Sequence, residues 1–187
     1  NREISVIEFI KHHLSISKKN EYNSIKDIKE LEIAERAFKS DIKFKRGNFG
    51  MLECFPLTVK DNYCSSSYLS SSCSGIIQNF VSVYESDVTK KLLEEGSIIM
   101  GKTNMDEFGL GSLNMNSYFG DVVNFFKKIG SNNFYSSGGS SGGSATSIAI
   151  KSAMASLGTD TGGSVRLPSV FANSVGFKPS YMSCSRH

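Results

Sequence analysis

Two serines in glycine-rich segments, together with a lysine upstream of them, are the residues of this sequence best suited to chemistry. Residues 138–144 read Gly-Gly-Ser-Ser-Gly-Gly-Ser and contain Ser140, and residues 158–166 read Gly-Thr-Asp-Thr-Gly-Gly-Ser-Val-Arg and contain Ser164. Lys60 directly follows an apolar, strand-like stretch. Glycine-rich backbone lets several N–H groups converge on one oxygen, because no Cβ blocks the approach.

These residue types predict acyl transfer that does not depend on histidine. A serine beside converging N–H groups has an oxyanion site next to it. A free lysine, with a pKa near ~10.4, is a poor base at neutral pH. Burial beside hydroxyl groups, with no carboxylate close enough to hold the charge, would lower the pKa of Lys60, and a neutral lysine can act as base toward a serine.

The composition favours a folded, globular chain of one domain or part of a larger one. Of 187 residues, 39% are hydrophobic and 21% charged, which argues against wholesale disorder. The net charge of +3 comes without a basic stripe, so nothing in the charge pattern favours nucleic-acid binding. No apolar run approaches the ~20 residues that span a bilayer. The four cysteines lack Cys-x-x-Cys spacing, which favours free thiols in a reducing compartment over a zinc site or disulfides.

Helical and strand-like segments alternate along the chain, which predicts an α/β fold with a largely buried sheet. A capping box at Ser5 and the apolar spacing predict the helices 6–16, 30–40, a helix from Ser86 to Gly96, and 145–152. The predicted strands are 57–59, 98–100 and 154–157. Residues 17–29 read as a solvated linker and residues 121–137 as an irregular surface insertion.

Residues 96–103 fit the phosphate-loop pattern G-x-x-x-x-G-K-[ST], but we reject nucleotide binding there. The pattern needs a strand before it and a helix after it, whereas here a helix precedes Gly96. The intervening Ser-Ile-Ile-Met favours a strand. The two glycines of the pattern are explained instead by the end of a helix at Gly96 and the end of a strand at Gly101.

The chain resembles the amidase signature family over nearly its whole length, and segments 138–144 and 158–166 are the specific part of that resemblance. The resemblance implies an amidase-signature fold, in which α-helices cover a mixed β-sheet core. Residues 1–187 would then be the N-terminal portion of the domain, truncated at the C-terminus.

The resemblance to the amidase signature family also implies a Ser–cis-Ser–Lys triad. The implied nucleophile is Ser164, the bridging serine on a cis peptide bond is Ser140, and the base is Lys60. The implied oxyanion donors are the backbone N–H groups of Thr161, Gly162 and Gly163. The resemblance implies no metal ligand.

Within the family, segments 79–84, 101–108 and 175–181 are similar to the glutamine-hydrolysing subunits of tRNA-dependent amidotransferases. That likeness implies glutamine as substrate and ammonia passed to partners, the B and C type subunits. ATP, Mg²⁺ and most tRNA contacts would belong to the partner, with no cofactor in this chain and no membrane. The alternatives are a stand-alone amidase acting on other amides and a non-catalytic fragment that binds a partner. The expected location is a mitochondrion, a plastid or a bacterial cytoplasm.

Several charged residues near these segments have structural interpretations. We expect Asp61 and Asp160 to cap local backbone, and Arg166 to serve as an ion-pair or hydrogen-bond partner. Residues 102, 106 and 107 (Lys, Asp, Glu) belong to the similar segments, but the sequence assigns them no chemical role.

Overall fold

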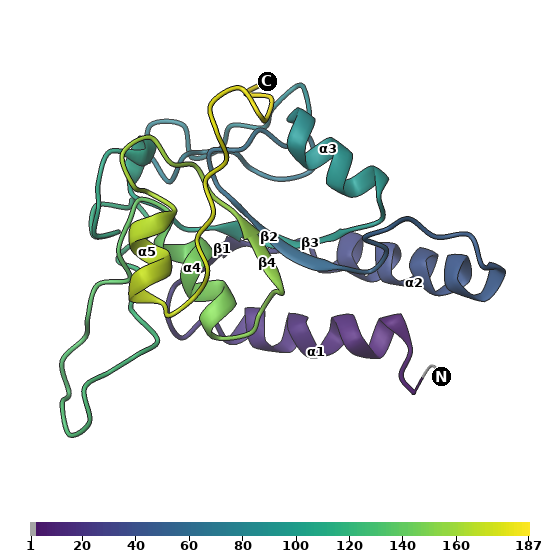
Figure 1. The fold of residues 1–187 in the computed structure, drawn as a ribbon, viewed down its shortest axis with the longest axis horizontal. Helices are drawn as coiled ribbons and strands as arrows, with labels where there is room; N and C mark the ends of the chain where they lie inside the picture. The colour runs from purple at the N-terminus through teal and green to yellow at the C-terminus, as the bar shows by residue number, and fades with distance from the viewer. Residues whose placement is uncertain (1–2) are drawn as a thin grey trace.

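The computed structural model describes residues 3–187, in which four strands form one mixed sheet with helices on both of its faces (Figure 1). The strands are β1 (Ile25–Asp27), β2 (Pro56–Lys60), β3 (Ile98–Thr103) and β4 (Ala155–Leu157). Their order in the sheet is β1-β3-β2-β4. β2 runs parallel to β3 and β4, and β1 is antiparallel to β3. The predicted α/β fold with a mixed sheet is confirmed.

The helices differ in which face of the sheet they cover. They are α1 (Val6–Lys19), α2 (Glu30–Arg46), α3 (Asp87–Glu94), α4 (Gly142–Ala149), α5 (Arg166–Phe171) and the short 3₁₀ helix η1 (Glu107–Gly109). Successive side chains of a strand point to opposite faces. Ile98 and Met100 of β3 therefore pack with α1 and α2, whereas Ile99 lies in the cluster that includes Leu92 of α3.

The same alternation in β2 determines where its functional residue points. Leu57 and Val59 pack in the cluster on the α3 side. Thr58 faces the other way, and its Oγ1 lies 2.8 Å from Ser147 Oγ of α4. Lys60, two residues after Thr58, therefore lies on the α4 face of the sheet, where the first glycine-rich segment ends.

The N-terminal predictions are partly confirmed. Ser5 forms the expected capping box with Glu8, but α1 continues to Lys19 and α2 to Arg46. The prediction of a linker at 17–29 is wrong, because these residues contain the last turn of α1 and strand β1. Asn20 closes the turn between them: its side chain accepts from Ile25 N (3.0 Å) and donates to Ile25 O (2.6 Å).

Two other element boundaries differ from the predictions. Gly101 lies inside β3 and not at its end, and a Cβ at Gly101 would meet Asp27 O of β1 at 2.6 Å. The close approach of β1 thus explains the glycine. The helix predicted at 145–152 begins at Gly142 and ends at Ala149. Helix α5, directly after the second glycine-rich segment, is not among the helices predicted from the sequence.

Residues 96–103 and 121–137 behave as the sequence predicts. Gly96 follows the end of α3, and residues 98–103 are extended in β3, so this backbone does not form a phosphate cradle. Residues 125–130 and 132–135 are exposed, and the segment around them extends away from the sheet at the lower left of Figure 1. A single bridge between Val123 and Ser136 closes its base.

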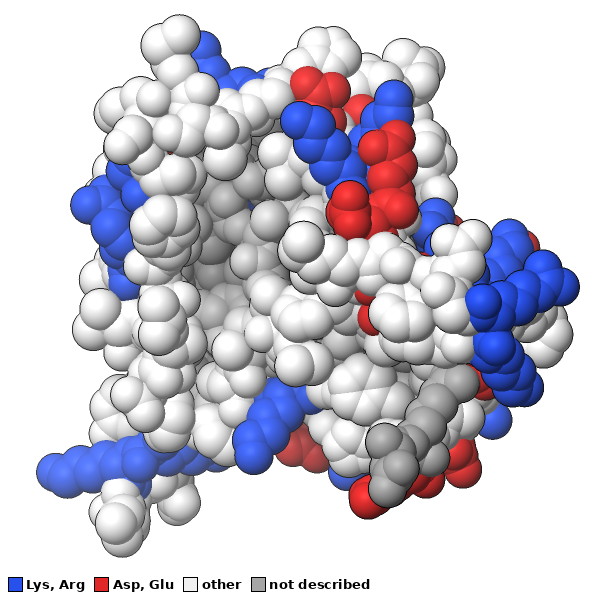
Figure 2. Space-filling view, turned by 45° about the vertical axis from the view of Figure 1, so that its right-hand side comes forward, with Lys and Arg blue, Asp and Glu red and all other residues white. Residues whose placement is uncertain are grey.

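The surface has no continuous basic stripe on the face that Figure 2 shows, where lysine and arginine side chains form separate groups. Among residues 3–187, no helix is both long enough and apolar enough to cross a membrane.

Candidate active site

Lys60 and Ser140 are brought into direct contact at the end of β2. The Lys60 side chain is fully buried, and its Nζ donates to Ser140 Oγ at 2.7 Å and to Thr159 O at 3.3 Å. Burial lowers the pKa of Lys60 from 10.5 to about 7, and the negative charge of Asp106 is the main influence that opposes this lowering. A large fraction of Lys60 is therefore neutral near pH 7, as a base requires.

Ser140 is held in place by its backbone. The Gly139–Ser140 peptide bond is cis, as the family resemblance implies. Gly139 N donates to Ser112 O at 2.7 Å, and Ser140 O accepts from Asp106 N at 3.2 Å. Ser140 itself is 1% exposed. These contacts aim its hydroxyl group at Lys60 and shield it from solvent.

Ser164 lies next to this pair through a contact between the two glycine-rich segments. Its carbonyl oxygen accepts from Ser141 N at 3.1 Å, and Ser141 Oγ donates to Thr159 O at 3.3 Å. Ser164 is only partly buried, and its Oγ forms no hydrogen bond with any residue of 3–187, including Ser140. The structure thus joins Lys60 to Ser140 and leaves the Ser164 hydroxyl group unengaged beside them.

Asp160 organises the loop that carries Ser164. Its Oδ1 accepts from Gly163 N at 2.8 Å, and its Oδ2 accepts from Val165 N at 3.1 Å. Arg166 adds a two-point contact through Nε (3.0 Å) and Nη2 (2.9 Å). This guanidinium, followed by the backbone N–H groups, holds the pKa of Asp160 well below its usual range. The expected capping role of Asp160 and the expected ion pair of Arg166 are both confirmed.

The three expected oxyanion donors differ in availability. The N–H groups of Thr161 and Gly162 form no hydrogen bond within the described chain, whereas Gly163 N is engaged by Asp160. A Cβ on Gly162 or Gly163 would meet no atom within 4 Å. Open space therefore lies beside this backbone, which is the room that a substrate carbonyl would need.

Asp61 has the local structural role that the sequence predicts. Its Oδ2 accepts from Cys73 N at 2.8 Å and from Ser71 Oγ at 2.7 Å. Lys26 Nζ lies 3.1 Å from Oδ1, and both side chains are buried. Asp61 thus anchors the loop after β2 and faces a lysine other than Lys60.

In a comparison with known proteins, residues 8–187 match the family model described as Amidase. The chain belongs to the amidase family. Among the relatives of this amidase chain is the A subunit of glutamyl-tRNA(Gln) amidotransferase from Orientia tsutsugamushi (strain Boryong). It is 42% identical over 188 residues, which cover 100% of this chain and 38% of the relative.

A second relative of this amidase has the same name as the first. The corresponding A subunit from Caulobacter vibrioides (strain NA1000 / CB15N) is 45% identical over 152 residues, covering 81% of this chain and 31% of the relative. The chain thus spans about two fifths or less of the length of these relatives.

Solved amidase-family structures share the fold. The A subunit of glutamyl-tRNA(Gln) amidotransferase from Thermotoga maritima superposes with a TM-score of 0.79 at 28% identity, covering 100% of this chain and 40% of that one. A bacterial aryl acylamidase of the amidase signature family gives a TM-score of 0.84 at 26% identity, covering 96% and 37%. The amidase-signature fold expected from the sequence is confirmed.

The sequence assigned no chemical role to one residue of this amidase site. Asp106, which follows β3, accepts hydrogen bonds from Asn114 N (3.0 Å) and Met115 N (3.2 Å), and donates its own N–H to Ser140 O. Its segment, Gly-Lys-Thr-Asn-Met-Asp-Glu-Phe, is one of those that carry the resemblance, but its letters do not indicate a contact with Ser140. Only the folded chain brings it to Ser140.

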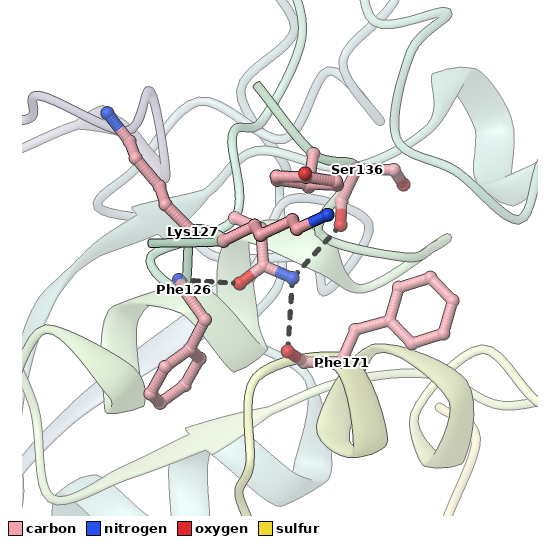
Figure 3. A pocket seen from close by; sticks show the side chains of 7 residues that line it. Phe126, Lys127, Ser136 and Phe171 are labelled. Atoms are coloured by element: carbon pink, nitrogen blue, oxygen red, sulfur yellow. Dashed lines mark hydrogen bonds between the residues drawn. The ribbon is translucent and has the colours of Figure 1, made fainter. Parts of the chain in front are cut away.

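An open pocket of about 630 Å³ lies outside the Lys60–Ser140 pair, between the insertion and α5 (Figure 3). It is lined by Asn124, Phe126, Lys127, Lys128, Tyr135, Ser136 and Phe171. Asn124 joins the two sides of the pocket, because its Nδ2 donates to Ser136 O (3.1 Å) and to Phe171 O (3.0 Å). The pocket contains none of the residues predicted for catalysis.

Proposed function

We propose that the full-length protein hydrolyses glutamine as the A subunit of a tRNA-dependent amidotransferase, with Ser164 as nucleophile, Ser140 as relay and Lys60 as base. The observation that carries the proposal is the 2.7 Å hydrogen bond from Lys60 Nζ to Ser140 Oγ in a buried site that lowers the pKa of the lysine. The two relatives named as amidotransferase A subunits, at 42% and 45% identity, support the choice of reaction.

The proposed reaction has two half-cycles. Ser164 Oγ attacks the side-chain amide carbon of glutamine while its proton passes through Ser140 to Lys60, and a C–O bond forms. The N–H groups of Thr161 and Gly162 stabilise the tetrahedral oxyanion. When the intermediate collapses, the C–N bond breaks, the lysine returns the proton to the leaving nitrogen, and ammonia departs. Water then attacks the acyl-enzyme by the same route and releases glutamate.

The later steps belong to partner subunits of the B and C type. Ammonia released at Ser164 is used there to convert Glu-tRNA(Gln) to Gln-tRNA(Gln), with ATP and Mg²⁺ held by the partner. Residues 96–103 carry the phosphate-loop letters, and residues 98–103 of this segment are extended in β3. Residues 3–187 contain no group of three or more His, Cys, Asp or Glu that could hold a metal ion.

A serine-directed fluorophosphonate tests the proposed nucleophile in the full-length protein. We expect one covalent adduct, located on Ser164 by peptide mapping and absent from Ser164→Ala. Ser131→Ala, which changes a serine in the exposed insertion, is the matched control and should label like the native protein. An adduct on another serine, or labelling that persists in Ser164→Ala, would refute the assignment.

A panel of amides separates this proposal from a stand-alone amidase. The similarity to a bacterial aryl acylamidase suggests aryl amides as the substrates to test for that alternative. We expect ammonia release from glutamine that increases when the B and C type subunits are added. Hydrolysis of aryl amides without partners, and none of glutamine, would favour the alternative while keeping the triad.

A further inference from the structure

Asp106 is a buried carboxylate that the proposed reaction does not use. It is 2% exposed and lies between β3 and η1. Its two carboxylate oxygens accept from Asn114 N and Met115 N, while its backbone N–H donates to Ser140 O at 3.2 Å. One residue thus joins the loop 107–115 to the peptide that carries Ser140.

The contact with this peptide is close enough to exclude other side chains. A Cβ at Gly139 would lie 2.0 Å from Asp106 Oδ2, and one at Gly111 would lie 2.4 Å from Asp106 Cγ. Asn114 extends the connection, because its Oδ1 accepts from Gly142 N at 2.9 Å at the start of α4. Asp106 therefore packs directly against the Gly139–Ser140 peptide, which carries the hydroxyl group that is bonded to Lys60.

The charge of Asp106 also differs from that of the other groups that face Lys60. Asp160 is paired with Arg166. Burial raises the pKa of the Cys73 thiol to about 12, so the thiol is neutral near pH 7. Asp106 has no ion-pair partner within residues 3–187. It is the largest charge effect opposing the lowered pKa of Lys60.

Other charged groups near the end of β2 are engaged elsewhere. Asp61, the next residue after Lys60, is paired with Lys26. Lys102 of β3 donates to Tyr63 O and to Ser70 Oγ.

We propose that Asp106 is a positioning residue of the Lys60–Ser140 pair: it fixes the Gly139–Ser140 peptide and supplies the unpaired negative charge that faces the lysine. The inference rests on the proposed function, because it concerns the same base. It assigns Asp106 no contact with substrate. Its consequence is that Asp106 sets the pH at which the site becomes active.

The test is the pH profile of glutamine hydrolysis by the full-length protein with its partner subunits. The reaction needs neutral Lys60, so kcat/KM rises with pH through the pKa of the lysine. Asp106→Asn removes the negative charge and disfavours the protonated lysine, so the rise should move to lower pH. Because the Asn amide leaves only one acceptor for two N–H groups, kcat at the plateau should also fall, by up to about 10²-fold, with KM little changed.

Glu107→Gln is the matched control, because it removes the neighbouring carboxylate. Glu107 accepts from Ser74 Oγ and is not among the groups acting on the pKa of Lys60. Its pH profile should match that of the native protein. If thermal melting shows that Asp106→Asn is not folded, Asp106→Ser is used in its place, because serine is smaller and keeps a hydrogen-bond acceptor. The expected shift of the pH profile to lower pH is the same.

The two hypotheses fail in different ways. An unchanged profile or an unchanged kcat in the Asp106 variant would overturn the inference while Lys60→Ala and Ser164→Ala remain inactive. Ammonia release that survives in Lys60→Ala and Ser164→Ala would overturn the proposed function itself, whatever the Asp106 variant does.

Discussion

Replacing Lys60 with methionine should stabilise the fold near neutral pH while abolishing activity. Burial lowers the pKa of the lysine from 10.5 to about 7. Since a shift of one pKa unit corresponds to ~1.36 kcal/mol, burying the protonated amine costs roughly 5 kcal/mol of folding free energy below pH 7. Methionine has a similar length and no charge, so it avoids this cost.

The variant also loses the two hydrogen bonds of Lys60. Ser140 Oγ would lose its lysine donor, at about 1–3 kcal/mol for a buried group left unsatisfied, whereas Thr159 O would keep its hydrogen bond from Ser141 Oγ. Taking about 3 kcal/mol for the two lost hydrogen bonds together, we expect Lys60→Met to be more stable than the native protein by roughly 2 kcal/mol below pH 7.

The sign of this difference depends on pH. The folded pKa lies below the unfolded one, so between about pH 7 and 10.5 the unfolded native protein binds more protons. The native protein therefore gains stability as pH rises through this window, and methionine does not. The stability advantage of Lys60→Met over the native protein should therefore shrink as pH rises from about 7, and it should reverse before pH reaches about 10.5.

Urea unfolding of both full-length proteins at about pH 6 and about pH 9.5 measures this change. Lys39→Met, which makes the same substitution at an exposed lysine of α2, is the control and should leave stability unchanged at both pH values. If the difference between Lys60→Met and the native protein does not vary with pH, the lysine is not a buried amine with a lowered pKa.

Three further predictions concern the surroundings of the site. Asp160→Asn should lower kcat by about 10²-fold, because the Ser164 loop loses its two-point contact with Arg166; activity equal to the native protein would contradict the role of this contact. Gly143→Ala should destabilise the fold by about 3 kcal/mol or more in urea unfolding, since its Cβ would meet Asn104 O at 2.4 Å; a smaller loss would show that the backbone can move apart. Replacing 126–133 with a two-glycine link should change unfolding free energy by less than about 1 kcal/mol and leave fluorophosphonate labelling unchanged; lost labelling would tie the insertion to the site.

The sequence predicts much of the site because its signals are local. The glycine-rich segments around Ser140 and Ser164 are recognisable within a few residues, and Lys60 follows a clear strand pattern. The lowered pKa of Lys60 could also be expected, because the end of a buried strand is an apolar environment.

The parts that the sequence did not predict depend on contacts between distant residues. Strand β1 is only three residues long, and it exists because Ile25 pairs with Thr103 and is bonded to the side chain of Asn20. Asp106 approaches Ser140 across 34 positions of the chain. No propensity or short-range spacing encodes such contacts.

The most direct test of the central claim is glutamine hydrolysis by the full-length protein, with and without the B and C type subunits, beside Ser164→Ala. We predict ammonia release that requires Ser164 and increases with the partners and with Glu-tRNA(Gln). Equal ammonia release from the native protein and Ser164→Ala would contradict the account.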